Sequence, residues 1–214
     1  MALPPALSLP TQVAAQAEFI VSNLRQTDYQ HTEHIDVDRG IYDCDCDGFV
    51  GFVLTRVAPD QYAMIPQEAG QSRPRAFEYC LFFSSLTPQS AGWHRIDFLR
   101  DVRRGDFIAW RFPEVEIEEG HDTGHVLVAA ETPGMDDSGI FTVRVYDSVT
   151  QPHFDDTRGD GPGQFPNGVG YGALKFQVDA GGRPIAFQFA PSDRFKSLPI
   201  AIGRVESLPA APES

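Results

Sequence analysis

The sequence predicts an α+β fold in which a few helices come first and an antiparallel sheet follows. Apolar residues recur at helical spacing in the N-terminal half, whereas from Gly105 onward they alternate with a period of two. Helices followed by a run of strands favour this fold class over alternating βαβ units. At 214 residues and 42% hydrophobic, the chain is long and apolar enough to bury a core.

Three helices are expected. The first covers 11–26, with Thr11 as a candidate N-cap and apolar residues on one face, namely Val13, Ala17, Ile20 and Leu24. The second covers 45–57 and the third 75–84. Cys80 belongs to an apolar set in the third helix, which predicts a buried structural thiol.

Six strands are expected in the C-terminal half. They cover 106–112, 125–130, 141–147, 173–178, 185–190 and 201–205. The sequence Asp-Ala-Gly-Gly-Arg at 179–183 is typical of a hairpin turn between the fourth and fifth strands. We expect one domain over 11–205, preceded by a flexible Pro-rich lead-in at 1–10 and followed by a loose tail at 206–214.

Composition excludes several classes of partner. The net charge of −13 argues against binding to nucleic acid or to an anionic membrane surface. No run approaches the roughly 18–20 apolar residues of a membrane-spanning helix. Three cysteines, an odd number with two of them one residue apart, imply no disulfide framework.

The N-terminus lacks the basic stretch and apolar core of a signal peptide. A cytoplasmic location is expected if Met1 is the native start, and a periplasmic or secreted one if a signal peptide was removed. The sequence does not indicate an oligomeric state, and no cofactor is expected.

The segment Tyr-Asp-Cys-Asp-Cys-Asp-Gly-Phe-Val-Gly at 42–51 carries the strongest functional signal. Cys46 stands where a polar stretch changes into an apolar, helix-compatible run. A cysteine in the first turn of a helix lies near free backbone N–H groups and the positive end of the helix dipole, which favour a thiolate. Cys46 is preferred over Cys44 as a nucleophile because it lies closer to the helix body. The alternative is that both thiols are small apolar core residues.

Two further residues complete a candidate catalytic set. His125 begins an apolar strand, and Asp147 is the last inward-facing residue of another. A carboxylate at that position needs a charged or hydrogen-bonding partner, which His125 on a neighbouring strand would supply. Cys46, His125 and Asp147 therefore predict a nucleophile, a base and an orienting acid. The alternatives are a hydrogen-bonded core histidine and a turn-capping aspartate.

Three short motifs resemble those of one enzyme family. Residues 45–50 (Asp-Cys-Asp-Gly-Phe-Val) resemble the Asp-Cys-Ser-Gly-Phe-Val motif of the NlpC-type papain-like cysteine peptidases. Residues 104–110 (Arg-Gly-Asp-Phe-Ile-Ala-Trp) resemble that family's Pro-Gly-Asp-Leu-Val-Phe-Phe strand, and 124–126 (Gly-His-Val) its His-Val-Gly strand. The motifs occur in the family's order and span about 40–150.

The resemblance implies a papain-like core, with the nucleophile helix packed against the antiparallel sheet. It implies hydrolysis of peptide or isopeptide amide bonds, including those of cell-wall-type peptides, with Cys46 as nucleophile, His125 as base and Asp147 as the third polar residue. Asp45 would lie beside the substrate's amine. The chain departs from the family in having Asp47 instead of serine and in a longer spacing from His125 to Asp147. Residues 151–205, including Gly-Val-Gly-Tyr-Gly at 168–172, lie beyond the resemblance.

The acidic residues around the cysteine modify this expectation. Asp43, Asp45 and Asp47 surround the sulfur, and their like charge disfavours a thiolate. We therefore expect a thiol less acidic than in family members with serine at this position, and an ion pair with His125 only when that residue is protonated. Asp45 and Asp47 are alternatively candidates to bind a substrate's ammonium group.

An oxyanion hole needs the backbone N–H of Cys46 and a second donor from upstream. Tyr42 is the candidate, with His34 and Tyr29 as alternatives. Four polar residues after Asp147 are expected to form a solvated loop, namely His153, Asp155, Asp156 and Arg158.

Three other functions are compatible with the same residues. Two cysteines and the pair His121 and His125 could bind zinc, but nearby glycines and the β-branched run after His125 argue against the helix that this spacing requires, so no metal is expected. A thiol acyltransferase, or a thioester or lipid hydrolase, would use the same acyl-enzyme chemistry. A catalytically inactive binding module would keep the scaffold without turnover.

Overall fold

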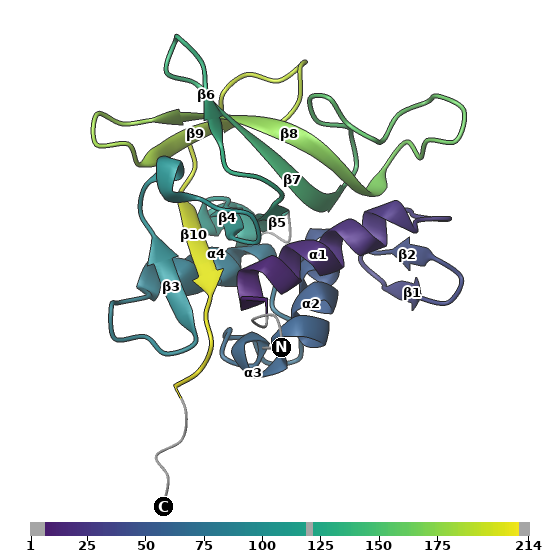
Figure 1. Cartoon of the computed structure of the whole chain (residues 1–214), viewed down its shortest axis with the longest axis horizontal. Coiled ribbons are helices and arrows are strands. Elements are labelled where there is room, and N and C mark those ends of the chain that lie inside the picture. Colours follow the sequence, from purple (N-terminus) through teal and green to yellow (C-terminus); the bar gives the residue numbers. More distant parts are fainter. Residues whose placement is uncertain (1–6, 119–121, 210–214) are drawn as a thin grey trace, which may run out of the picture.

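The structure is a computed structural model that describes residues 7–118 and 122–209 (Figure 1). Its helices are α1 (Leu9–Ser22), α2 (Cys46–Val57), α3 (Pro59–Tyr62), α4 (Ala76–Ser85), α5 (Glu114–Glu118) and the 3-10 helix η1 (Leu99–Asp101). Its strands are β1 (His34–Asp36), β2 (Ile41–Asp43), β3 (Trp93–Ile96), β4 (Phe107–Arg111), β5 (Gly124–Ala129), β6 (Gly134–Met135), β7 (Phe141–Val149), β8 (Gly168–Val178), β9 (Pro184–Gln188) and β10 (Ile200–Val205).

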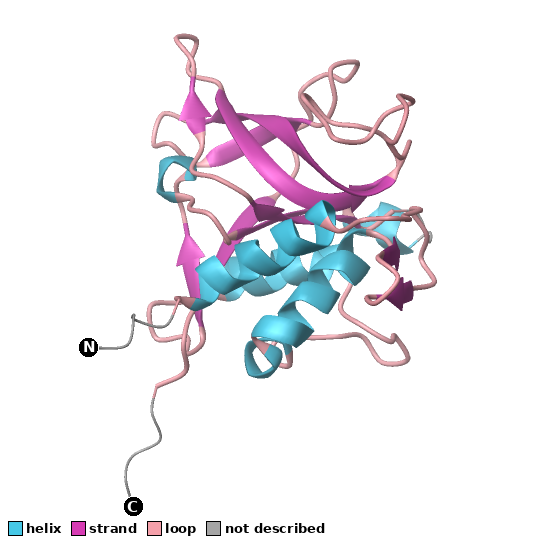
Figure 2. Ribbon diagram, turned by 45° about the vertical axis from the view of Figure 1, so that its right-hand side comes forward, coloured by secondary structure: helices cyan, strands magenta, loops and turns pink. Residues whose placement is uncertain are grey.

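The main sheet is antiparallel throughout and runs in the order β3-β10-β4-β5-β7-β8-β9, with β6 added beside β7. The short strands β1 and β2 form a separate antiparallel pair. The helices α1, α2 and α4 gather on one side of the curled sheet (Figure 2), whereas Leu99 of η1 belongs to the core cluster of the other face. The expected α+β class with an antiparallel sheet is confirmed.

Strand alternation produces a core on each face of the sheet. Phe107 and Val126 belong to the cluster beneath α1, α2 and α4, whereas their chain neighbours Ile108 and Leu127 belong to the cluster on the opposite face. Because side chains of a strand alternate between faces, the period of two in the sequence becomes two apolar layers. Burial on both faces explains why all six residues of β5 are buried.

The three expected helices are present. The first begins earlier than expected, because Ser8 is the N-cap and Thr11 lies within the first turn. Pro10 occupies that first turn without loss, since its missing N–H has no partner there anyway. Leu9 and Pro10 are therefore helical and not part of a flexible lead-in, and Ser8 caps the helix. Residues 1–6 of that expectation lie outside the described residues, as does the tail beyond 209.

All six expected strands are present, but β8 begins five residues before the expected start at 173. Its first residues are rich in glycine, which lowers the strand propensity that a sequence-based prediction relies on. β1, β2 and β3 were not expected, because the first two lie in a polar segment and the third in a connecting region. The hairpin at 179–183 is confirmed by hydrogen bonds between Asp179 and Arg183.

None of the described helices combines the length and the apolar character needed to cross a bilayer. All three cysteines lie in the described part of the chain and are free thiols. Cys80 is fully buried, as expected.

Replacing Phe83 by alanine should test the core between α4 and the sheet. Its ring is fully buried and contacts the rings of Tyr79, Trp93 and Phe107. We expect Phe83→Ala to lower the free energy of unfolding by roughly 3–5 kcal/mol, measured by urea denaturation. Phe19→Ala is the matched control, because that ring is 51% exposed, and it should change stability by less than about 0.5 kcal/mol. Equal effects of the two substitutions would contradict this view of the core.

Candidate active site

Cys46 is the first residue of α2, where the sequence predicted a helix N-terminus. The side chain of Asp45 caps the helix by accepting a hydrogen bond from the backbone N–H of Gly48 (2.9 Å). The hydroxyl of Ser148 donates to the carbonyl of Cys44 (2.6 Å). This bond joins the segment before α2 to β7, one residue after Asp147, and so places the helix N-terminus next to that end of the sheet.

His125 and Asp147 lie on the same face of the sheet, because Leu127 and Val145 on their strands belong to the same core cluster. The strands β5 and β7 pair only through Val128↔Tyr146 and Ala129↔Val145, away from the histidine. Beyond this pairing, His125 Nε2 and Asp147 Oδ2 are 2.8 Å apart and share a hydrogen bond. The expected contact between the imidazole and the carboxylate is therefore present.

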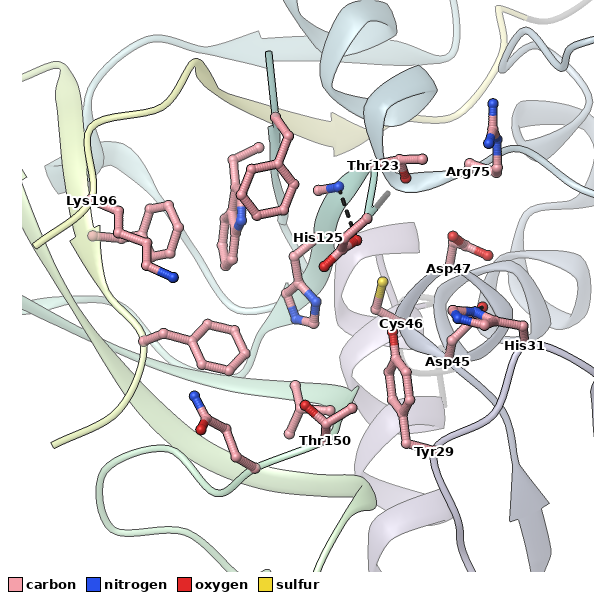
Figure 3. Close-up of a pocket in the computed structure, with 18 of the residues that line it drawn as sticks. Tyr29, His31, Asp45, Cys46, Asp47, Arg75, Thr123, His125, Thr150 and Lys196 are labelled. Carbon is pink, nitrogen blue, oxygen red and sulfur yellow. Dashed lines mark hydrogen bonds and ion pairs between the residues drawn. The ribbon is translucent and has the colours of Figure 1, made fainter. Parts of the chain in front are cut away.

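Cys46 and His125 both line a pocket of about 650 Å³. In Figure 3 the sulfur of Cys46 and the ring of His125 project into this pocket from its two sides. On the histidine side the lining is aromatic and includes Trp110, Phe187 and Phe189. The ring of Trp110 lies 5.0 Å from that of His125, between centroids, and limits how far the imidazole can turn.

The segment after Asp147 corrects the expectation of a solvated loop. His153 and Arg158 are buried, and both contact Asp147. His153 Nε2 lies 2.8 Å from Asp147 Oδ2, and the guanidinium of Arg158 donates to Asp147 Oδ1 (2.9 Å). Asp156 is in turn bonded to Arg158, whereas Asp155 is exposed. No local pattern distinguishes this segment from a solvated one, because its partners are on β7 and β8.

These contacts determine the charge of Asp147. Burial alone would raise the pKa of its carboxyl group, but the charges of His153 and Arg158 and the hydrogen bonds from both histidines hold that pKa well below its usual value. Asp147 is therefore a carboxylate at neutral pH.

A bound metal ion is an alternative explanation for this cluster, because ligand atoms of His125, Asp147 and His153 lie within 4.8 Å of one another. However, both histidines are already within hydrogen-bonding distance of the same oxygen, and Arg158 occupies the other oxygen with a positive charge. A cation would have to separate these bonds and lie beside a guanidinium, so hydrogen bonding explains the arrangement better. Of the other suggested zinc ligands, Cys44 is fully buried in the core and His121 lies outside the described residues.

The thiol of Cys46 is less acidic than a helix N-terminus alone would make it. Burial raises its pKa well above the usual value, and the charges of Asp47 and Asp45 raise it further. A hydrogen bond from the N–H of Val126 lowers it only in part. This direction agrees with the expectation from the sequence. Asp43 is not among the main causes of this shift, and its carboxylate is bonded to Gln26 and His34.

Asp45 and Asp47 line the pocket but are already paired with Arg73, a residue that the sequence did not single out. The guanidinium lies 2.7 Å from Asp45 and 2.5 Å from Asp47, and it also approaches Glu33. His31 makes a further contact with Asp45. A substrate's ammonium group would therefore have to share these carboxylates with Arg73 or displace it. Arg73 had no sequence signal, since it follows its partners by 26 and 28 residues.

The structure contradicts the prediction that Tyr42 is the second donor of an oxyanion hole. Its ring is buried in the core against Phe52, and it is not among the residues that line the pocket. Tyr29, one of the alternatives, lines the pocket and directs its hydroxyl toward Cys46 (Figure 3). Burial raises the pKa of this phenol, and the charges of Cys46 and Asp45 raise it further, so the hydroxyl keeps its proton and can donate it.

No protein-family model matches the chain, and no curated protein or solved structure is significantly similar to it. The resemblance to the NlpC-type peptidases therefore stays a prediction based on three short motifs.

Asp47→Asn should raise the reactivity of Cys46 in a pH-dependent way. Burial and the charge of Asp45, opposed by Arg73, raise the pKa of Asp47 to about 7, so its negative charge is present above that pH and absent well below it. We expect alkylation of Cys46 by iodoacetamide to become roughly 3- to 10-fold faster in the variant at pH 8–9. The two rates should converge near pH 5.

The labelled cysteine is identified by fragment mass spectrometry. Asp43→Asn is the matched control and should leave the rate unchanged, because its carboxylate is directed toward Gln26 and His34. If the alkylation rate of Asp47→Asn differs from that of wild type by the same factor at pH 5 and pH 9, the charge of Asp47 does not act on the thiol.

Proposed function

We propose that this protein is a cysteine hydrolase that cleaves peptide or isopeptide amide bonds, with Cys46 as nucleophile, His125 as base and Asp147 as orienting acid. The observation that carries the proposal is the hydrogen bond between His125 and a buried carboxylate, in a pocket that the N-terminal cysteine of α2 also lines. A nucleophile, a base and a group that orients the base are the parts required for acyl transfer through a covalent intermediate.

The hydrogen bond assigns the form of the base. Because Asp147 is a carboxylate, His125 Nε2 must carry the proton that it donates. In the neutral ring Nδ1 then has a free lone pair and can accept a proton. Since the pKa of Cys46 is raised, its thiol keeps its proton at neutral pH. The resting pair in this proposal is a neutral thiol and a neutral imidazole.

The proposed reaction proceeds in two halves. As the sulfur of Cys46 attacks the amide carbon, His125 takes the thiol proton and Asp147 stabilises the resulting imidazolium. His125 then gives this proton to the leaving amine as the C–N bond breaks, which leaves a thioester on Cys46. Water, deprotonated by His125, attacks the thioester and releases the carboxylic acid, and the thiol recovers its proton.

The negative oxygen of the tetrahedral intermediate needs donors that are already in place. The backbone N–H of Cys46 belongs to the first turn of α2, where backbone N–H groups have no partner within the helix. The hydroxyl of Tyr29 is the second donor in this proposal, because it is protonated and lies on the cysteine side of the pocket.

A papain-like core is part of the proposal. It is supported by the packing of α2 against β5 and by the chain order of cysteine, histidine and aspartate. Cell-wall-type peptides are among the candidate substrates through the motif resemblance. An acyltransferase would share the first half-reaction and differ only in the acceptor of the thioester, so the acceptor is varied in the test below.

Cys46→Ala should abolish turnover, and His125→Ala should lower kcat by at least about 10³-fold. Hydrolysis of a panel of dipeptidyl aminomethylcoumarin amides and the burst of nitrophenolate from p-nitrophenyl acetate are the measurements. Cys80→Ala is the matched control, because that thiol is on the buried face of α4 and is not among the residues that line the pocket. Unchanged acylation in Cys46→Ala would overturn the assignment. If the acyl group on Cys46 is transferred to added glycinamide in preference to water, the protein is instead an acyltransferase.

Tyr29→Phe should lower kcat by roughly 10- to 100-fold with little change in KM, because the hydroxyl acts on the transition state more than on the bound substrate. Tyr42→Phe removes the same atom from a ring outside the pocket lining and should leave kcat unchanged. If kcat falls only in Tyr42→Phe, Tyr42 and not Tyr29 is the second donor of the oxyanion hole.

A further inference from the structure

We propose that His153 and Arg158 are positioning residues, which hold Asp147 as a fixed carboxylate and thereby keep the Nε2 proton of His125 in place. This inference rests on the proposed function, since it assigns a role in the same site. It concerns the segment between β7 and β8, which lies beyond the motifs shared with the peptidase family.

The oxygens of Asp147 are held from several directions. Oδ2 contacts both His125 Nε2 and His153 Nε2 at 2.8 Å, and Oδ1 accepts from Arg158 at 2.9 Å. Asp147, His153 and Arg158 are each buried. With donors on both oxygens, the carboxylate has no freedom to rotate away from His125, so the imidazole that it holds is fixed as well.

The contacts of His153 assign its protonation. Its Nδ1 lies 2.9 Å from the carbonyl oxygen of Phe189, which can only accept a hydrogen bond. Its Nε2 faces the carboxylate of Asp147, which also only accepts. Both ring nitrogens therefore carry protons, and His153 is an imidazolium. Its positive charge compensates Asp147, while Arg158 also pairs with Asp156 at 2.8 Å, so the buried set of two acids and two cations is neutral.

The strand β8 leaves room for this arrangement. Gly170 is the direct cross-strand partner of Asp147, and a Cβ at Gly170 would come within 2.7 Å of the Arg158 side chain. A Cβ at Gly172 would come within 2.5 Å of Asp156 and 3.0 Å of His153. Glycine at these alternate positions thus keeps one face of the strand open, which gives the glycine-rich motif at 168–172 a physical purpose.

The charged and titratable groups around Asp147 come from two parts of the fold. They are His125 on β5 and, between β7 and β8, the set His153, Asp156 and Arg158. Asp45 and Asp47, at the N-terminus of α2, line the pocket that His125 also lines and are paired with Arg73. Among them, His153 is the positive group that shares an oxygen of Asp147 with His125. Replacing His153 therefore removes a positive charge that is bonded to the same carboxylate oxygen as His125.

Nitrogen-15 NMR of the histidine rings tests the arrangement without any substrate. At pH 7.5 we expect both ring nitrogens of His153 to be protonated and His125 to carry its proton on Nε2, with signals assigned through His153→Gln and His125→Gln. A neutral His153 ring would overturn the inference. Added zinc should change the ring signals of neither histidine. Loss of the Nε2–H signals of both His125 and His153 at one equivalent of zinc would overturn the inference in favour of a metal site.

Kinetics test the positioning role. We expect His153→Gln, which can still donate one hydrogen bond, to lower the acylation rate with p-nitrophenyl acetate roughly 10- to 100-fold. The acid limb of its pH–rate profile should also move upward by about half a unit or more, because the compensating charge is lost. A uniform loss at every pH, with the acid limb unmoved, would assign a merely structural role and overturn the inference.

A second variant keeps the test independent of the folding of His153→Gln. Gly170→Ala should displace Arg158 and reproduce the loss of rate, whereas Gly134→Ala, where a Cβ would meet nothing within 4 Å, should not. Equal rates in wild type and Gly170→Ala would contradict the proposal. If wild type and Cys46→Ala are acylated at the same rate, the proposed function fails, and the ring spectra then decide the hydrogen-bond arrangement separately.

Discussion

The site depends on one constraint, which is that the carboxylate of Asp147 is fully buried and must be compensated. An uncompensated buried charge costs several kcal/mol, enough to remove a large part of the stability of a domain. The compensation comes from His125 on β5 and from His153 and Arg158 after β7. Satisfying this single charge therefore brings together two strands and a long connection, and it orients the imidazole that faces the pocket.

On the sulfur side of the pocket, the surroundings disfavour the charged form of the side chain. A helix N-terminus stabilises a nearby anion by only about 0.3–2 kcal/mol, whereas burial and two neighbouring carboxylates raise the pKa of Cys46 well above its usual value. The dipole is the smaller of these effects, so the thiol keeps its proton. Arg73 moderates the acidic surroundings, because its guanidinium lies between Asp45 and Asp47. In the proposed reaction, the base is therefore held by a charge-compensated carboxylate, and the thiol loses its proton only to that base.

Local sequence patterns were good guides wherever a structure is specified by neighbouring residues. The start of α2 was predictable because Asp45 is a strong N-cap followed by a helix-compatible run. The strands β4, β5 and β7 were predictable from their alternation. The same approach missed the first five residues of β8, where glycines that make room for Arg158 resemble a loop. It also failed at β1 and β2, which have three residues each and are too short to show a period.

The amino-acid sequence by itself determined the fold class, the positions of the main helices and strands, and the pairing of a histidine with an aspartate at the end of two apolar faces. Only the tertiary structure decided which charges meet. Arg73 reaches Asp45 across 28 residues, and His153 turns back to Asp147 to become buried. It also placed Tyr29 in the pocket and Tyr42 in the core. The physical reason is that a side chain's partners across the chain depend on how elements pack, which leaves no periodic trace in the residues themselves.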